Sequence, residues 1–354
     1  MKKLFILFVA VAMVAAFTVP AAADAEWNFY GSARMATFYV SDDPDIPGID
    51  SDEGTVWAQQ GNSRIGARVK FNDEISGRFE MSDGFGKRLL YGTYNFGGGE
   101  LLLGQSYTPT TYFYSNSVYN GDGDLLNIGQ FYEGRQPMIQ LKFPFGLKFA
   151  AVTPTTTPTG TYDTDVTIPK LELSYGFKTD VFFVDVFGGY QTFDLEATVP
   201  GERDTDITSM VYGLGAGANI GPVFFKLGVH QGENIGDYAG IWDQVGGRNM
   251  SASVDAVTGS VTDNDAFGYL AVVGFKAGDA ATFEFGYGYQ EYDSNIAGFQ
   301  ADETFQYYVN ATVNITKGFF IVPEIGIVDR DEGAVAGGAE GDITYFGLKW
   351  QINF

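Results

Sequence analysis

Apolar and polar residues alternate along most of the chain. In the segment 305–315 the odd-numbered positions are apolar or aromatic, and most of the even-numbered positions are polar. The segments 170–177, 223–230 and 283–290 have the same period of two. Successive side chains of a β-strand point to opposite faces of the sheet. The pattern therefore predicts an all-β chain whose strands each have one apolar face and one largely polar face.

The connections between these strands also alternate, between short and long. Seven short segments rich in Gly, Asp and Asn read as hairpin turns: 71–74, 97–99, 144–146, 178–180, 220–222, 277–280 and 316–318. Eight mostly longer loops interleave with them: 41–54, 82–87, 107–134, 154–166, 196–206, 233–263, 293–302 and 330–341. Seven turns and eight loops join 16 strands. Roughly 21 residues are available for each strand and its connection, which is ample for a tilted membrane-spanning strand of about 10 residues.

The first 25 residues have the features of an export signal. Lys2 and Lys3 precede an apolar run over 4–19, and small residues stand at Ala23 and Ala25. This order predicts a secretory signal peptide at 1–25 that is cleaved from a barrel domain at 26–354. Cleavage after Ala23 and an uncleaved N-terminal anchor are the alternatives.

Composition narrows the possible functions. The 354 residues include no cysteine, which excludes disulfides and Cys-ligated metal sites. The 44 acidic residues exceed the 21 basic ones, and this excess disfavours nucleic-acid binding. His230 has no neighbouring serine, so the chain shows no catalytic constellation. We therefore expect no enzyme activity, no cofactor and no metal site, although the Asp/Gly segment 120–124 leaves a calcium-binding loop open as an alternative.

An exported chain whose strands each have one apolar and one polar face has the pattern expected of a protein that spans a lipid bilayer. In lipid an unpaired backbone group costs several kcal/mol, so a sheet must close on itself and turn its polar face to a lumen. The sequence therefore predicts a transmembrane antiparallel β-barrel of 16 strands in the bacterial outer membrane.

Four segments resemble the trimeric porins of Gram-negative bacteria. They are Phe29-Tyr30-Gly31 in the first strand, Asn62-Ser63-Arg64-Ile65-Gly66 entering the second, the segment 103–109, and the C-terminal segment 345–354. The resemblance implies a 16-stranded homotrimeric barrel whose third loop folds inward and narrows the pore. Gln105 stands where such porins often carry an arginine.

The resemblance also extends to the end of the chain. A terminal aromatic residue with apolar residues at alternate positions is similar to the signal read by the barrel-assembly machinery. Its members here are Phe346, Leu348, Trp350, Ile352 and Phe354.

Alternation assigns several charges to the lumen. The basic candidates on the first three strands are Arg34, Arg64, Arg68, Lys70 and Arg78, and the third loop supplies Asp122, Asp124 and Glu133. A basic wall that faces an acidic loop would set a transverse field across the constriction and favour small hydrophilic solutes. The alternative is that the arginines pair with nearby acids. The acidic outer loops predict a mild cation preference and could bridge divalent cations to lipopolysaccharide.

The function expected from the sequence is passive diffusion of small hydrophilic solutes and ions across the outer membrane. Two alternatives stay open, a substrate-specific sugar or anion channel and a non-conducting surface adhesin barrel. Tyrosines of the third loop that could stack on sugar rings are Tyr112, Tyr114, Tyr119 and Tyr132.

Overall fold

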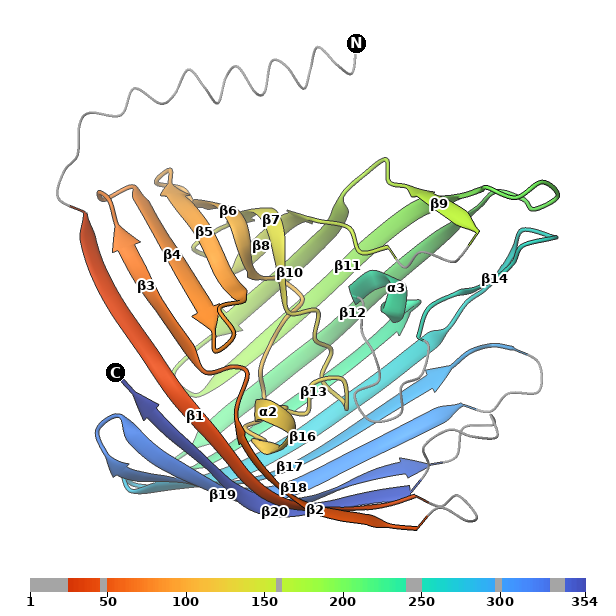
Figure 1. The fold of residues 1–354 in the computed structure, drawn as a ribbon. Coiled ribbons are helices and arrows are strands. Elements are labelled where there is room, and N and C mark those ends of the chain that lie inside the picture. Colours follow the sequence, from red (N-terminus) through yellow and green to blue (C-terminus); the bar gives the residue numbers. More distant parts are fainter. Residues whose placement is uncertain (1–24, 45–49, 157–160, 240–249, 297–300, 332–340) are drawn as a thin grey trace.

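The chain closes into an antiparallel β-barrel of 16 strands, as the sequence predicts (Figure 1). This computed structural model describes residues 25–354 apart from 45–49, 157–160, 240–249, 297–300 and 332–340. The expected signal peptide, except its last residue, lies outside the described residues. Among the residues described, no helix is long and apolar enough to cross a bilayer.

Eighteen labelled strands make up the barrel wall, because two of its 16 strands are interrupted. β2 and β3 both pair with β1, and β9 and β10 both pair with β11. The wall consists of β1 (Glu26–Asp43), β2 (Asp52–Gln59), β3 (Arg64–Lys70), β4 (Ile75–Ser82), β5 (Lys87–Asn95), β6 (Glu100–Tyr107), β7 (Arg135–Lys142), β8 (Leu147–Val152), β9 (Tyr162–Asp165), β10 (Lys170–Lys178), β11 (Phe182–Ala197), β12 (Thr205–Ile220), β13 (Val223–Glu233), β16 (Asp265–Ala277), β17 (Ala281–Asp293), β18 (Asp302–Thr316), β19 (Phe319–Asp331) and β20 (Gly341–Asn353).

The first and last strands close the barrel. β1 pairs with β20 in antiparallel register from Ser32 opposite Asn353 to Asp43 opposite Asp342. Short turns and longer loops alternate at the seven and eight places expected from the sequence. The start of β1 and the C-terminus therefore lie at the same end of the barrel as the short turns (Figure 1).

The barrel wall is uneven in height. Strands β3 to β8 have six to nine residues, whereas β11 to β13 and β16 to β20 have 11 to 16. The wall is therefore low on the β3–β8 side (Figure 1).

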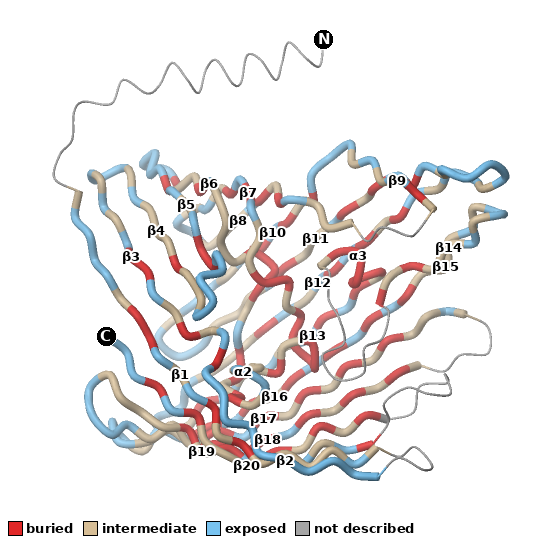
Figure 2. The backbone as a smooth tube through the Cα atoms, in the orientation of Figure 1, coloured by how far each residue is buried: buried red, intermediate tan, exposed pale blue. Residues whose placement is uncertain are grey.

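Burial confirms the two faces of the strands. Phe283 and Phe285 are exposed on the outside of β17, whereas Glu284 between them is buried. On β18 Val309 is exposed and its neighbour Asn310 is buried. Figure 2 shows the same alternation along the long strands. Apolar side chains thus face outward and polar ones face the interior.

Two loops enter the interior, and among the described residues four of the five buried clusters form between them and the wall. The fifth cluster consists of residues of β6, β7 and β8. Loop 3 (108–134) contains α2 (Tyr119–Asp122), and loop 6 (234–264) contains α3 (Ile235–Ala239) and the hairpin of β14 (Ser253–Asp255) and β15 (Ser260–Thr262). The cluster that joins both loops to the wall consists of Phe131, Phe187, Val211, Ile235, Tyr238, Met250, Ala266 and Tyr292.

Candidate functional site

Loop 3 leaves the end of β6, crosses the lumen and returns to β7 (Figure 1). Three glutamates of the wall accept hydrogen bonds from its backbone. Glu172 of β10 accepts from Thr110 N at 3.1 Å, and Glu284 of β17 accepts from Asn116 N at 2.6 Å. Glu324 of β19 accepts from the amides of residues 118 and 119 at 2.8 and 3.0 Å. Because a buried amide needs a partner, these carboxylates fix the course of the loop.

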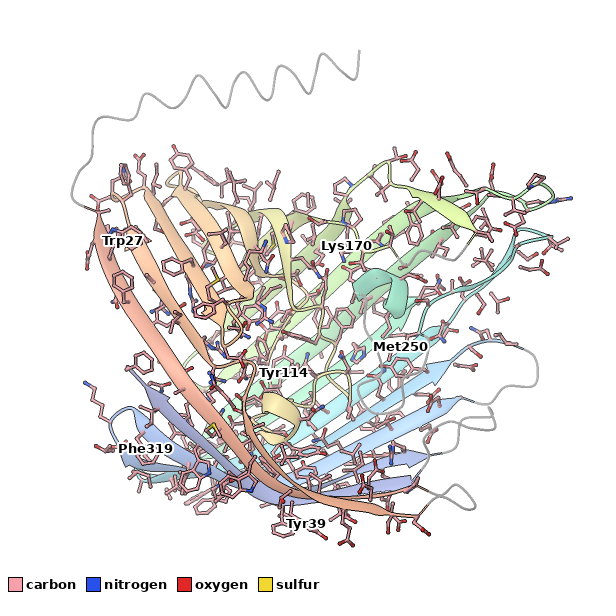
Figure 3. The ribbon with its side chains drawn as sticks, viewed as in Figure 1. Trp27, Tyr39, Tyr114, Lys170, Met250 and Phe319 are labelled. Carbon is pink, nitrogen blue, oxygen red and sulfur yellow. The ribbon has the colours of Figure 1, made fainter. Side chains whose placement is uncertain are left out.

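Glycines of the wall make room for the loop where it lies closest. A Cβ added to Gly215 of β12 would overlap the hydroxyl of Tyr114, which Figure 3 places in the middle of the barrel. A Cβ added to Gly288 of β17 would overlap the carbonyl of Ile128. The absence of side chains at these two lumen-facing positions allows loop 3 to lie directly on the sheet.

Asp122 fastens the middle of loop 3 to the closure between β1 and β20. Its carboxylate pairs with Arg34, lies 2.7 Å from Nζ of Lys349, and accepts from Nδ2 of Asn62 at 2.8 Å. Burial favours the neutral acid, but the Lys349 ammonium, its hydrogen bond and Arg34 outweigh burial and lower the pKa of Asp122. Asp122 is thus held as a carboxylate by two cations of the wall.

Glu133 fastens the end of loop 3 to a different part of the wall. Its Oε1 lies 2.5 Å from Nζ of Lys170 on β10, and both side chains are fully buried. Asp124 is the third acid of the loop, and burial first and the nearby Asp122 second raise its pKa well above the usual value. The sequence predicts a basic wall facing an acidic loop, with ion pairing between them as the alternative. The contacts of two loop acids follow the alternative, since Asp122 pairs with Arg34 and Lys349, and Glu133 pairs with Lys170.

A cluster of arginines on β3 to β5 shares one carboxylate. Oε1 of Glu80 lies 2.8 Å from Nε of Arg88 and 3.4 Å from an Nη of Arg64. Oε2 lies 3.0 Å from an Nη of Arg78 and accepts from the hydroxyl of Tyr30 at 2.8 Å. Three guanidinium groups and one carboxylate leave this part of the lumen wall with a formal charge of +2.

Arg88 was missed by sequence analysis, and a β-bulge explains why. Met81 pairs with Lys87 and Glu80 pairs with Leu89, so Arg88 is an extra residue on β5. An extra residue shifts the alternation of the strand by one position and re-aims a side chain. Simple alternation counted from the outward-facing Leu90 would place Arg88 outside, but the bulge turns it to Glu80.

The remaining basic candidates differ in their surroundings. The guanidinium carbon of Arg68 lies 5.2 Å from the ring centroid of Tyr30. Lys70 bonds Asp73 at 2.7 Å in the exposed turn after β3, so it lies at the rim rather than in the middle of the lumen. Arg135 of β7, which sequence analysis also missed, lies 5.3 Å from the ring centroid of Tyr107.

A cavity of about 720 Å³ extends along the low wall. Its lining includes Arg68, Arg78, Tyr91, Gln140 and Lys148, which come from β3, β4, β5, β7 and β8. The cavity therefore lies along the β3–β8 wall, whereas the tethers from Glu172, Glu284 and Glu324 fix loop 3 to the β10–β19 side. Among the residues described, no group of three His, Asp or Glu side chains could hold a metal ion.

Comparison with known proteins agrees with this architecture. The family model described as Gram-negative porin matches residues 10–332. The chain belongs to the Gram-negative porin family. The fold and the family together place this porin in the outer membrane as a channel-forming barrel. A search of curated protein sequences gave no match.

Several solved porin structures share the fold. The outer-membrane channel DcaP of Acinetobacter baumannii is 18% identical, with a TM-score of 0.71 over 96% of this chain and 99% of that one. The anion-selective porin of Comamonas acidovorans is 14% identical, with a TM-score of 0.62 over 94% and 100%. The trimer form of OmpT from Vibrio cholerae is 16% identical, with a TM-score of 0.57 over 93% and 99%. At these identities the likeness concerns the fold alone.

The C-terminal residues with the expected assembly pattern lie on β20 and at its end. Phe346, Trp350 and Ile352 are exposed on the outer face, and the alternate residues Tyr345, Lys349 and Gln351 are buried toward the lumen. Leu348 shares the outer alternation with Phe346. Recognition of Phe354 and these residues by the assembly machinery stays a prediction.

Proposed function

We propose that this porin is a passive diffusion channel in which small hydrophilic solutes and ions pass along the β3–β8 wall beside loop 3. The observation that carries the proposal is the division of the lumen. Loop 3 is tied to the opposite wall through Glu172, Glu284 and Glu324, and the cavity of about 720 Å³ follows the low wall. Polar lining and a size limit favour small solutes over apolar ones.

We further propose that the filter is the arginine cluster around Glu80, in place of a field between a basic wall and an acidic loop. The cluster keeps a formal +2 charge after its internal ion pairs. The loop acids add no net negative charge beside it, because Arg34 and Lys349 together exceed the charge of Asp122, and Lys170 balances Glu133. Charges near a narrow, low-dielectric passage act more strongly on permeating ions than charges at a wide mouth, which water and salt screen. We therefore expect a mild anion preference, even though the outer loops are acidic.

Single-channel recording tests both statements. The purified protein in a planar bilayer should give steady conductance steps, and a KCl gradient should give a reversal potential of anion-selective sign. A folded barrel without steady conductance would support the adhesin alternative and overturn the channel. A cation-selective reversal potential would leave the channel standing and overturn the proposed filter.

A substrate-specific anion channel is the second candidate function. Arg68 and Arg78 lie 5.2 and 5.1 Å from the ring centroid of Tyr30, and Arg68 forms no ion pair with an acid among the described residues. This arrangement could hold a carboxylate beside an aromatic ring. Saturable flux of a small carboxylate and block of KCl current by it would separate this function from general diffusion.

The sugar alternative has less support. Tyr114 is buried against the wall, and Tyr119 stacks on Tyr345 with ring centroids 3.8 Å apart. Tyr112 stacks on Phe187, and Tyr132 lies against Phe113, so all four tyrosines that could stack on sugar rings already contact other aromatic side chains.

We propose that the porin is a homotrimer that associates through the low wall. Apolar residues exposed on the outside of β3 and β5 to β7 include Ile65, Leu90, Leu103 and Ile139. One structure of OmpT, which shares the fold, is of a trimer form. Current steps grouped in threes, together with the mass of the detergent-solubilised particle, test the assembly. Contacts with lipopolysaccharide stay a prediction.

A further inference from the structure

Loop 6 is the second segment that enters the barrel. α3 lies beside β12 in the interior, in the part of the lumen where Figure 3 labels Lys170 and Met250. Tyr238 of α3 is fully buried, and its ring centroid lies 6.0 Å from that of Phe131 in loop 3. Loops 3 and 6 therefore pack against each other as well as against the wall.

Lys170 joins three loops with one ammonium group. Its Nζ lies 2.5 Å from Oε1 of Glu133 in loop 3 and donates to the carbonyl of Tyr238 in loop 6 at 2.6 Å. It also lies 3.3 Å from Oγ1 of Thr155, in the loop between β8 and β9. A fully buried charge is tolerated only with its hydrogen-bond partners in place. Displacement of any one of these loops would therefore leave Lys170 short of a partner.

Tyr238 adds a second link between the same loops. Its hydroxyl donates to Oε1 of Glu172 at 3.0 Å, and Oε2 of the same carboxylate accepts from Thr110 N of loop 3. Gly189 of β11 leaves the space that the hydroxyl occupies, because an added Cβ would overlap it. The wall thus leaves space for the Tyr238 hydroxyl, and Tyr238 shares its hydrogen-bond partner Glu172 with loop 3.

We propose that Lys170 and Tyr238 form a latch through which loop 6 holds loop 3 against the β10–β12 wall and so sets the calibre of the channel. The statement about calibre rests on the proposed diffusion function, but the latch itself does not. Lys170 and Tyr238 are positioning residues, since they act on permeation through loop 3.

Two neighbouring glycines give a matched test. Gly189→Ala places a methyl group where the Tyr238 hydroxyl lies, and Gly188→Ala adds the same methyl group where the nearest atom lies 3.6 Å away. We expect Gly189→Ala to lower the mean single-channel conductance and the size of the neutral polymers admitted, because a released loop 3 can move from the β10–β12 wall into the passage along β3–β8, with Gly188→Ala unchanged. Tyr238→Phe, which keeps the ring and loses the bond to Glu172, should give a smaller decrease.

Thiol labelling tests the latch without any conductance. Ala266 of β16 is buried beneath loops 3 and 6 in their shared cluster, and the chain has no cysteine of its own. In Ala266→Cys we expect maleimide labelling to accelerate about tenfold when Gly189→Ala is added, because local opening exposes the site. Gly188→Ala should not change the rate.

Folding is checked by the resistance of the barrel to unheated SDS, and Tyr238→Ser takes the place of Gly189→Ala if that variant does not fold.

The outcomes separate the two proposals. A wild-type protein that does not conduct overturns the diffusion function, and the labelling rates alone then decide the latch. Folded Gly189→Ala with the labelling rate of its parent overturns the latch. Faster labelling with unchanged conductance and polymer cut-off overturns the claim that the latch sets the calibre.

Discussion

The ring of Phe354 covers Gly31, and the two backbones bond to each other. Gly31 N donates to the carbonyl of Phe354 at 2.7 Å, and Phe354 N donates to the carbonyl of Gly31 at 3.0 Å. A Cβ added to Gly31 would overlap the ring. The C-terminal residue thus continues the β1–β20 ladder, and the glycine opposite it leaves space for its ring.

A side chain at Gly31 should weaken barrel closure. Gly31→Leu forces the Phe354 ring from its place, and overpacking of this kind costs about 1–3 kcal/mol. The expected result is a lower temperature for loss of SDS resistance. Ala33→Leu, at the next outward and exposed position of β1, is the matched control and should leave that temperature unchanged. Equal losses in both variants would mean that the ring over Gly31 adds nothing to closure.

Neutralising Glu80 should increase anion preference. Glu80→Gln keeps an acceptor for Arg88 and raises the formal charge of the arginine cluster from +2 to +3. The reversal potential in a KCl gradient should move further in the anion-selective direction. Asp73→Asn makes the same change of formal charge in an exposed turn and should have little effect, since exposed charges are screened. Equal shifts in the two variants would argue against a filter at the cluster.

Acid should release the Asp122 tether only at low pH. The pKa of Asp122 is lowered in the folded protein, so its ion pairs add stability above the unfolded pKa of about 3.9. That stability is lost as the pH falls through the lowered pKa. Current noise from loop 3 should therefore stay low from neutral pH down to about pH 4 and increase below it.

Two substitutions check the assignment to Asp122. Asp122→Asn removes the partner of Arg34 and Lys349 and should be noisy at every pH. Asp124→Asn is the control, because burial raises the pKa of Asp124 and no ion pair among the described residues includes it. Acid-induced noise that persists unchanged in Asp122→Asn would assign the transition to another group.

The sequence was sufficient for the barrel because its signals are local. Alternation within each strand predicts its apolar and polar faces, and the regular alternation of short and long connections predicts 16 strands. Neither prediction requires knowing which residues are in contact. The interruptions between β2 and β3 and between β9 and β10 were not predicted, nor were the short strands on one side. Alternation continues across such breaks and therefore does not mark them.

The interior was harder to predict because its contacts are remote in sequence. Alternation placed Glu172 and Glu284 on the lumen face, but their partners in loop 3 lie 62 and 168 residues away. The bulge at Arg88 also breaks the period that would have assigned it. Gly215 and Gly288, which face loop 3, are only a partial signal, because other lumen-facing glycines such as Gly274 and Gly286 leave space for aromatic rings of the wall itself.

Glu324 provides the test of how far the wall glutamates define the passage. It accepts from the amides of residues 118 and 119 and from Oγ of Ser117, and Nδ2 of Asn310 donates to it at 2.9 Å. In Glu324→Gln an NH2 group replaces one carboxylate oxygen and faces the N–H donors of loop 3, which it cannot accept. Each buried donor left without an acceptor destabilises the folded loop by about 1–3 kcal/mol. Loop 3 should then detach locally near α2, with more frequent closures and faster proteolysis within 108–134.

Glu291→Gln, whose carboxylate accepts from the hydroxyl of Tyr289 on the outer side of β17, is the matched control. If Glu324→Gln conducts as quietly as this control, loop 3 is held by its ion pairs at Asp122 and Glu133, and the amide contacts to the wall follow from that position rather than cause it.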